Sequence, residues 1–195
     1  MDSVFTLQWP EFLLANELQK MLPKAQGYSV LIPTSRQEKG IDLAIIKKAR
    51  GNSRVATIQI KASRTYMPDP PKRHTTERYR YYTWFNRFDV PDDADFFLLF
   101  GMYPPDGKQT KSVNAQWYQH LTLLFDHEEM KELMSNCRTR SGRPDKMFGF
   151  GFDNEKKVVL TRGDEHGSRK DYSHHLLQNR IDVLRNYLSS RSHQK

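Results

Sequence analysis

The chain has 195 residues, of which 37% are hydrophobic; this suits one globular domain, whereas two half-length domains would each be small for an independent core. Its 31 Lys and Arg outnumber its 23 Asp and Glu, so the net charge is +8. This excess favours a polyanionic partner, nucleic acid before an anionic membrane, although a basic protein without such a partner is the plain alternative. The single cysteine, Cys137, excludes an intrachain disulfide and a cysteine-based zinc site.

The first residues lack the basic start and apolar core of a signal peptide, and no uninterrupted apolar run approaches the ~20 residues that cross a bilayer. We therefore expect a cytoplasmic protein with no membrane partner. One domain is expected over residues 1–188, followed by a disordered tail at 189–195.

The first predicted element is a helix over residues 10–22. Pro10 suits its first turn, where the missing N–H would have no intrahelical partner. A buried stripe at helical spacing is formed by Leu14, Leu18 and Met21. Glu17 borders this stripe.

Strands are predicted next, at residues 28–32, 41–47 and 55–62, and a turn over 48–54 joins the last two. Further along, the expected elements are core strands at 96–100 and 117–125, a short helix from Asp126 with a capping box to Glu129, a hairpin of 147–152 and 156–162, and a last helix from about 173. A helix followed by three strands and then mixed elements predicts an α/β or α+β fold.

Polar residues stand where the second and third strands should be apolar. Side chains alternate along a strand, so Gln59 and Lys61 share one face of the third strand. If the two strands pair antiparallel through the 48–54 turn, the start of one lies opposite the end of the other. Asp42 would then approach Gln59 and Lys61 at one end of the sheet.

Such a trio has a chemical use. Mg²⁺ prefers oxygen ligands, and Asp42 and Gln59 can supply a carboxylate and an amide oxygen. A bound Mg²⁺, or Mn²⁺ in its place, would lower the pKa of a bound water, and Lys61 would offset charge on a phosphate. Glu17 could reach the same water or metal. Taken singly, each residue is better explained as a strand cap, a surface residue or a snorkelling lysine; together they favour a site.

The pattern resembles the PD-(D/E)xK nucleases, which have the restriction-endonuclease-like fold. The resemblance covers residues 10–62 and consists of ANELQKML, GYSVLI, GIDLAII and IQIKAS in that order. It implies an α/β fold with a central mixed sheet flanked by helices, elaborated by residues 63–188. It also implies Mg²⁺-dependent hydrolysis of DNA and, since homodimers are common in the family, a possible homodimer.

Carried over residue by residue, the resemblance makes Asp42 the motif aspartate, Gln59 the (D/E) residue, Lys61 the lysine and Glu17 the glutamate of the first helix. Two positions depart from the motif. Ile41 replaces the proline before the aspartate, and Gln59 replaces an acid. The second change removes a negative charge from the metal site and leaves open an inactive or weakened site.

Basic and aromatic residues around the motif are candidates for binding nucleic acid. They comprise Arg36, Lys39, Arg64, Tyr66, Arg73, Arg78 and Arg80. The alternating aromatics of 79–88 also fit a strand that is half core and half surface, and the basic loop 138–146 is a second candidate surface. Two alternatives to an enzyme remain: a non-catalytic nucleic-acid-binding member of the fold, and a protein-interaction subunit of a defence system that uses the 79–88 surface.

The remaining nucleophile and ligand candidates are weaker. His120, His127, His174 and His175 have no zinc-protease spacing, and we expect solvated or capping histidines. Cys137 has no histidine nearby in the sequence, so a thiol nucleophile is not expected.

Overall fold

The structure is a computed structural model, and it describes residues 9–33, 40–48, 53–67, 79–103, 118–153, 157–164 and 169–190. Within them the helices are α1 (Trp9–Met21), α2 (His127–Ser135) and α3 (Leu177–Ser189). The strands are β1 (Tyr28–Leu31), β2 (Leu43–Lys48), β3 (Ser53–Tyr66), β4 (Tyr81–Asn86), β5 (Phe96–Tyr103), β6 (Gln119–Asp126), β7 (Met147–Phe152) and β8 (Val158–Arg162). No helix among the described residues is both long and apolar enough to span a bilayer.

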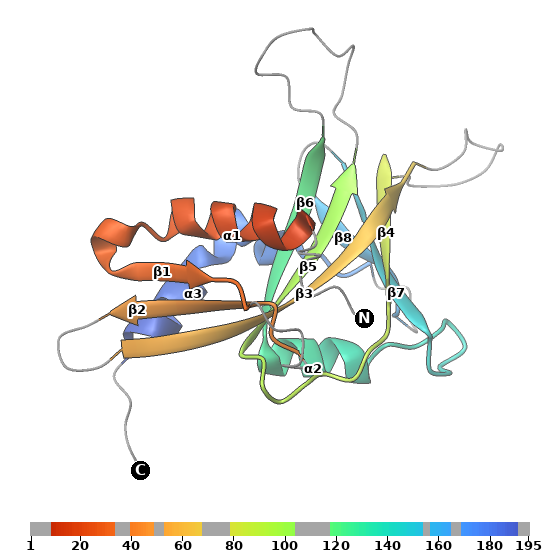
Figure 1. The fold of residues 1–195 in the computed structure, drawn as a ribbon. Coiled ribbons are helices and arrows are strands. Elements are labelled where there is room, and N and C mark those ends of the chain that lie inside the picture. The colour runs from red at the N-terminus through yellow and green to blue at the C-terminus, as the bar shows by residue number, and fades with distance from the viewer. Residues whose placement is uncertain are drawn as a thin grey trace, which may run out of the picture.

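The strands form an eight-stranded sheet in which β3 is the branch point. β1, β2 and β3 pair antiparallel in chain order, β5 adds to β3 in parallel, and β6 pairs antiparallel with β5. The end of β3 turns away to pair with β4, from which β7 and β8 continue (Figure 1). The expected α/β fold with a mixed sheet and flanking helices is therefore present, with β3 and β5 as its parallel pair.

Two apolar cores lie on opposite faces of β5, because alternate side chains of a strand point to opposite sides. Phe96, Leu98 and Phe100 pack with α1 and α3 in one core. Phe97 and Leu99 pack with α2, β4, β7 and β8 in the other. Helices α1 and α3 thus cover one face of the sheet, and the second group of strands folds over the other (Figure 1).

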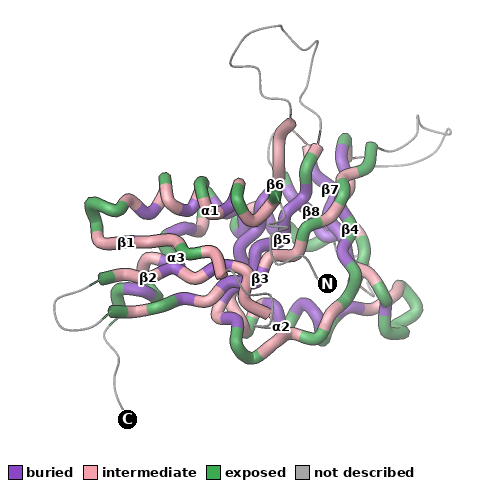
Figure 2. The backbone as a smooth tube through the Cα atoms, in the orientation of Figure 1, coloured by how far each residue is buried: buried purple, intermediate pink, exposed green. Residues whose placement is uncertain are grey.

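Most predicted elements are present with small shifts of their ends. The expected 55–62 strand is longer, the expected helix from 173 begins as a 3₁₀ turn at Ser173–His175 before α3, and Asp126 forms the expected capping box. Within 79–88, Tyr81, Thr83 and Phe85 are buried between more exposed neighbours, which confirms a strand that is half core and half surface (Figure 2). The predicted tail at 189–195 begins too early, since Ser189 ends α3 and the Ser190 N–H donates to the Asn186 carbonyl; residues 191–195 lie outside the described residues.

Candidate active site

Asp42 lies directly before β2, and its carboxylate reaches across to β3. Its backbone N–H donates to the Ile58 carbonyl at 2.9 Å, and its Oδ2 accepts from the Ile60 N–H at 2.6 Å. Leu43 pairs with Ile58, so Asp42 stands opposite Gln59. The carboxylate therefore contacts the residue between Gln59 and Lys61, which is the juxtaposition that the antiparallel pairing predicted.

Gln59 presents a buried oxygen beside Asp42. Only 9% of Gln59 is exposed, and its Oε1 has no hydrogen-bond partner among the described residues. Leaving such a buried acceptor unsatisfied costs about 1–3 kcal/mol, so a cation or a water molecule there would be stabilising. Gly40, at φ +93°, lies close to Pro91 and to the Gln59 amide, so the turn before Asp42 closes over this position.

Lys61 lies on the same face of β3 as Gln59, and an aromatic ring positions its ammonium group. Its Nζ is 4.8 Å from the centre of the Phe88 ring, in cation–π geometry. Phe88 in turn packs against Phe97 and Phe148. Sequence reasoning missed Phe88, because it lies 27 residues after Lys61 and no local pattern connects the two.

The structure does not bring Glu17 to the other three residues. Glu17 Oε1 lies 2.8 Å from Nε2 of His120, on β6. α1 packs in the core that contains Ile58, whereas Gln59 and Lys61 point to the other side of β3. Glu17 is thus across the sheet from Asp42, Gln59 and Lys61, and its described polar contact is the histidine.

A second carboxylate near the site is already engaged. Asp95 Oδ2 accepts from the backbone N–H and from the hydroxyl of Thr57, at 2.8 and 2.9 Å, and Oδ1 accepts from the Tyr187 hydroxyl at 2.7 Å. Burial and the bond to Asp95 raise the pKa of Tyr187 to about 12. Asp95 thus anchors the start of β5, and the described residues contain no group of three His, Cys, Asp or Glu that could hold a metal.

The residues predicted to bind nucleic acid are only partly described. Arg36, Lys39, Arg73 and Arg78 lie outside the described residues. Arg64 and Tyr66 are exposed toward the end of β3, on the face opposite Lys61, and Tyr66 stacks on Trp84 of β4 with 5.2 Å between ring centres. Arg80 is exposed just before β4, with its guanidinium 5.5 Å from the centre of the Tyr81 ring.

The prediction of solvated or capping histidines is wrong for His175, which is 5% exposed and stacks on Phe125. The 3₁₀ turn before α3 directs its ring inward, a geometry that local sequence does not reveal. Cys137 is buried, and burial raises the pKa of its thiol, so the unreactive protonated form is favoured.

Comparisons of the chain with protein-family models, with curated proteins and with solved structures found no match. Membership of the PD-(D/E)xK nucleases therefore stays a prediction.

Proposed function

We propose that the protein hydrolyses phosphodiester bonds of DNA with the help of a divalent metal ion. The observation that carries this proposal is the contact of the Asp42 carboxylate with the Ile60 amide, beside the buried unpaired oxygen of Gln59. An Asp before the second strand and a Gln-x-Lys on the third agree with the order in the PD-(D/E)xK resemblance. The antiparallel β1–β2–β3 unit with β5 added in parallel supports a restriction-endonuclease-like sheet.

The donor atoms suit a hard cation such as Mg²⁺ or Mn²⁺. Mg²⁺ is commonly bound by one or two carboxylates, with waters and substrate phosphate completing its shell. Asp42 supplies one carboxylate, and Gln59 supplies a neutral oxygen whose unpaired state such an ion would relieve. When bound there, the ion would polarise the phosphate and lower the pKa of a water.

Lys61 has the role of charge stabilisation in this proposal. As the water oxygen bonds to phosphorus and the bond to the leaving sugar oxygen breaks, negative charge grows on the phosphate oxygens. An ammonium group that is already oriented stabilises this charge without reorganisation. The contact with Phe88 provides such orientation. Glu17, held by His120 across the sheet, has no step in this mechanism.

The test is cleavage of single-stranded, duplex and branched DNA with Mg²⁺ or Mn²⁺, together with calorimetric titration of Mn²⁺ alone. Asp42→Asn keeps an acceptor for the Ile60 N–H but removes the charge, and Lys61→Met keeps the aliphatic stem. We expect each to lower the cleavage rate by about 10²-fold or more. Asp42→Asn should also weaken Mn²⁺ binding, whereas Gln59→Glu should tighten it by adding a second carboxylate.

Asp182→Asn and Lys20→Met are the matched controls, since both residues are exposed on helices and the substitutions change charge by the same amounts. Both should cleave like the unchanged protein. Cleavage that survives Asp42→Asn and Lys61→Met would show that another site acts.

One observation favours a second function, which is nucleic-acid binding without cleavage. With Gln59 in place of an acid, Asp42 is the one carboxylate among Asp42, Gln59 and Lys61. In that case DNA would be retained at low salt, Mn²⁺ would bind no more tightly than to Asp42→Asn, and neither metal would stimulate cleavage.

A further inference from the structure

A second site lies on the outer surface of the other strand layer, in a cavity of about 440 Å³. We call it the arginine pocket, and its lining includes Tyr79, Tyr82, Arg138, Arg140, Arg162 and Arg169. The volume falls within the range of about 300–1,000 Å³ that small-ligand sites occupy. None of its lining residues belongs to the Asp42, Gln59 and Lys61 site.

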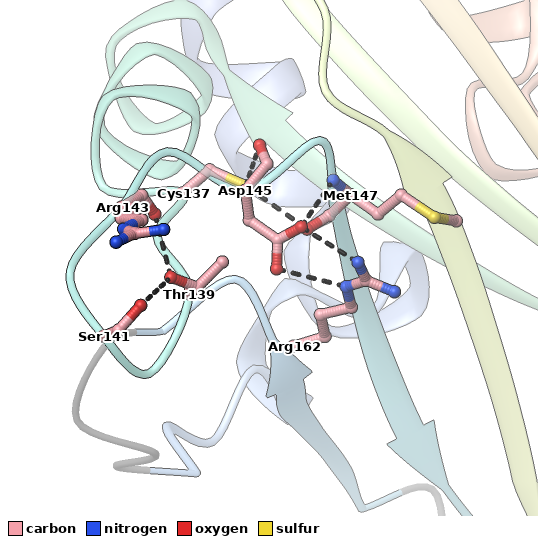
Figure 3. A network of polar contacts seen from close by, with 7 residues as sticks. All are labelled: Cys137, Thr139, Ser141, Arg143, Asp145, Met147 and Arg162. Carbon is pink, nitrogen blue, oxygen red and sulfur yellow. Dashed lines mark hydrogen bonds and ion pairs between the residues drawn. The ribbon is translucent and has the colours of Figure 1, made fainter.

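The loop that carries Arg138 and Arg140 is held in shape by its own hydrogen bonds (Figure 3). Thr139 N–H and Oγ1–H both donate to the Arg143 carbonyl, at 2.7 and 3.2 Å. The loop is also tied to the residue after β8, because Arg138 N–H donates to the Gly163 carbonyl, and its two ends are joined by the bond from Asp145 N–H to the Cys137 carbonyl. Arg138 and Arg140 therefore lie on a loop whose backbone is held in place by hydrogen bonds.

Arg162 is oriented by a buried acid. Its Nε and Nη2 donate to the two carboxylate oxygens of Asp145, at 3.1 and 3.0 Å (Figure 3). The hydrogen bond from Arg162 holds the pKa of Asp145 below its usual value, so this acid stays charged. These two bonds use the Nε and Nη2 side of the guanidinium group, so Nη1 points away from Asp145. Four arginines against Asp145 and Asp164 give the lining a net charge of +2 (4 − 2).

The pocket continues into a row of aromatic rings on the outer face of the strands. We call this row the aromatic strip, and it comprises Tyr79, Tyr82, Trp84 and Tyr66. Tyr79 and Tyr82 meet edge to face at 6.1 Å, and Tyr66 stacks on Trp84. Trp84 and Tyr66 are 37% and 46% exposed.

Two glycines of β7 make this arrangement possible. A Cβ at Gly149 would overlap the Trp84 ring, and one at Gly151 would overlap Tyr79. The rings of Trp84 and Tyr79 therefore pack directly on the β7 backbone. Arg64 lies on the same face of β3 as Tyr66 and extends the positive charge along the strip.

We propose that the arginine pocket and the aromatic strip bind single-stranded DNA, with a backbone phosphate in the pocket and bases stacked along the strip. Arginine groups neutralise phosphates, and exposed rings bind bases of any sequence through their faces. Duplex DNA hides its base faces, and an acidic peptide has none, so the combination of rings and charge favours the single strand. This site goes beyond the proposed hydrolysis, because binding here requires neither a metal nor Lys61.

The test is fluorescence anisotropy with labelled oligodeoxythymidine in EDTA, compared with a hairpin duplex of equal length and with polyglutamate. The single strand should bind most tightly. Arg138→Ala with Arg140→Ala should weaken it by at least about ten-fold and make the slope of log K against log salt shallower by about 0.7, which is the contribution of the one phosphate contact in the pocket. Tyr82→Leu should weaken it by at least about five-fold through lost stacking.

Lys20→Ala with Lys24→Ala removes the same charge from the exposed surface of α1 and the turn after it, and should change binding less than two-fold. The proposal is overturned if this control weakens binding as much as the arginine pair, if Tyr82→Leu has no effect, or if the duplex or polyglutamate binds as tightly. Asp42→Asn should bind the single strand normally. A protein that binds it but cleaves no DNA would refute the hydrolysis and leave this inference standing.

Discussion

His175 shows at the scale of one residue how burial sets protonation. Its Nδ1 lies 3.0 Å from the Leu124 carbonyl oxygen and 2.8 Å from Arg180 Nη1. A neutral ring can satisfy one of these partners, whereas a doubly protonated ring would place its charge against the guanidinium. Burial above all lowers the pKa of His175 to about 4.

The free energy of unfolding should consequently fall in mild acid. The unfolded chain binds a proton at His175 near its ordinary pKa of 6.5, whereas the folded protein does so only near 4. Stability present above pH 6.5 is thus lost as the pH falls toward 4, by an amount on the order of 3 kcal/mol. Urea denaturation at pH 7.5 and pH 4.5 measures this loss.

His175→Asn keeps a donor near the Nδ1 position and should flatten the dependence. His174→Asn, at the exposed neighbouring position, should leave it unchanged. An unaltered pH profile in His175→Asn would assign the acid sensitivity to other groups.

At the scale of elements, α2 begins with a complete capping box. The Asp126 side chain accepts from the Glu129 N–H at 2.9 Å, and the Glu129 side chain accepts from the Asp126 N–H at 2.9 Å. Glu129 is also paired with Arg180 of α3. The capping box therefore fixes the first turn of α2 and one of its connections to α3.

Asp126→Ala should lower the free energy of unfolding by about 1 kcal/mol, because N–H groups of the first turn lose their acceptor. Thermal or urea denaturation measures the loss. Asp126→Ser, which restores a capping oxygen, should recover most of it. Glu128→Ala removes an acid from the same turn without a capping bond and should have a smaller effect. Equal losses for Asp126→Ala and Asp126→Ser would mean that the charge, not the cap, matters.

Local pattern predicts elements well and their partners poorly. Leu14 and Leu18 of the α1 stripe, the capping box and the neighbouring β2 and β3 were predictable, although Met21 is only half-buried and Leu22 is buried instead. The antiparallel pairing of β2 and β3 placed Asp42 opposite Gln59. The position of Glu17 was not predictable, because periodicity defines which face of a helix is buried but not which face of the sheet covers it. Phe88 beside Lys61 and the outer aromatic strip depend on contacts between residues far apart in the chain.

At the scale of the whole molecule, β5 couples the unfolding of the two cores, because it contributes side chains to both. It is buried on both faces, so neither core can open without exposing the strand that also supports the other. We expect a single cooperative unfolding transition, with equal calorimetric and van't Hoff enthalpies.

Leu98→Ala and Leu99→Ala each remove a side chain from one core only. Each should lower the midpoint of the same transition, at a cost of about 2–5 kcal/mol. Far-ultraviolet and near-ultraviolet circular dichroism should report coincident curves. Two separate steps, each shifted by only one substitution, would show that the cores unfold independently.

Because both faces of β5 are buried, the contrast between a polar and an apolar face that usually fixes the register of a strand is absent. A strand with one wet face resists a shift by a single residue, since the shift would drive polar groups inward. Residues 96–100 are all apolar, so β5 shifted by one residue would still bury apolar side chains on both faces. Asp95, directly before β5, fixes the register instead. Its backbone N–H donates to the Thr57 carbonyl, and its carboxylate accepts from the N–H and hydroxyl of Thr57. The correct register of the apolar strand β5 against β3 thus depends on one acid, Asp95, at the start of the strand.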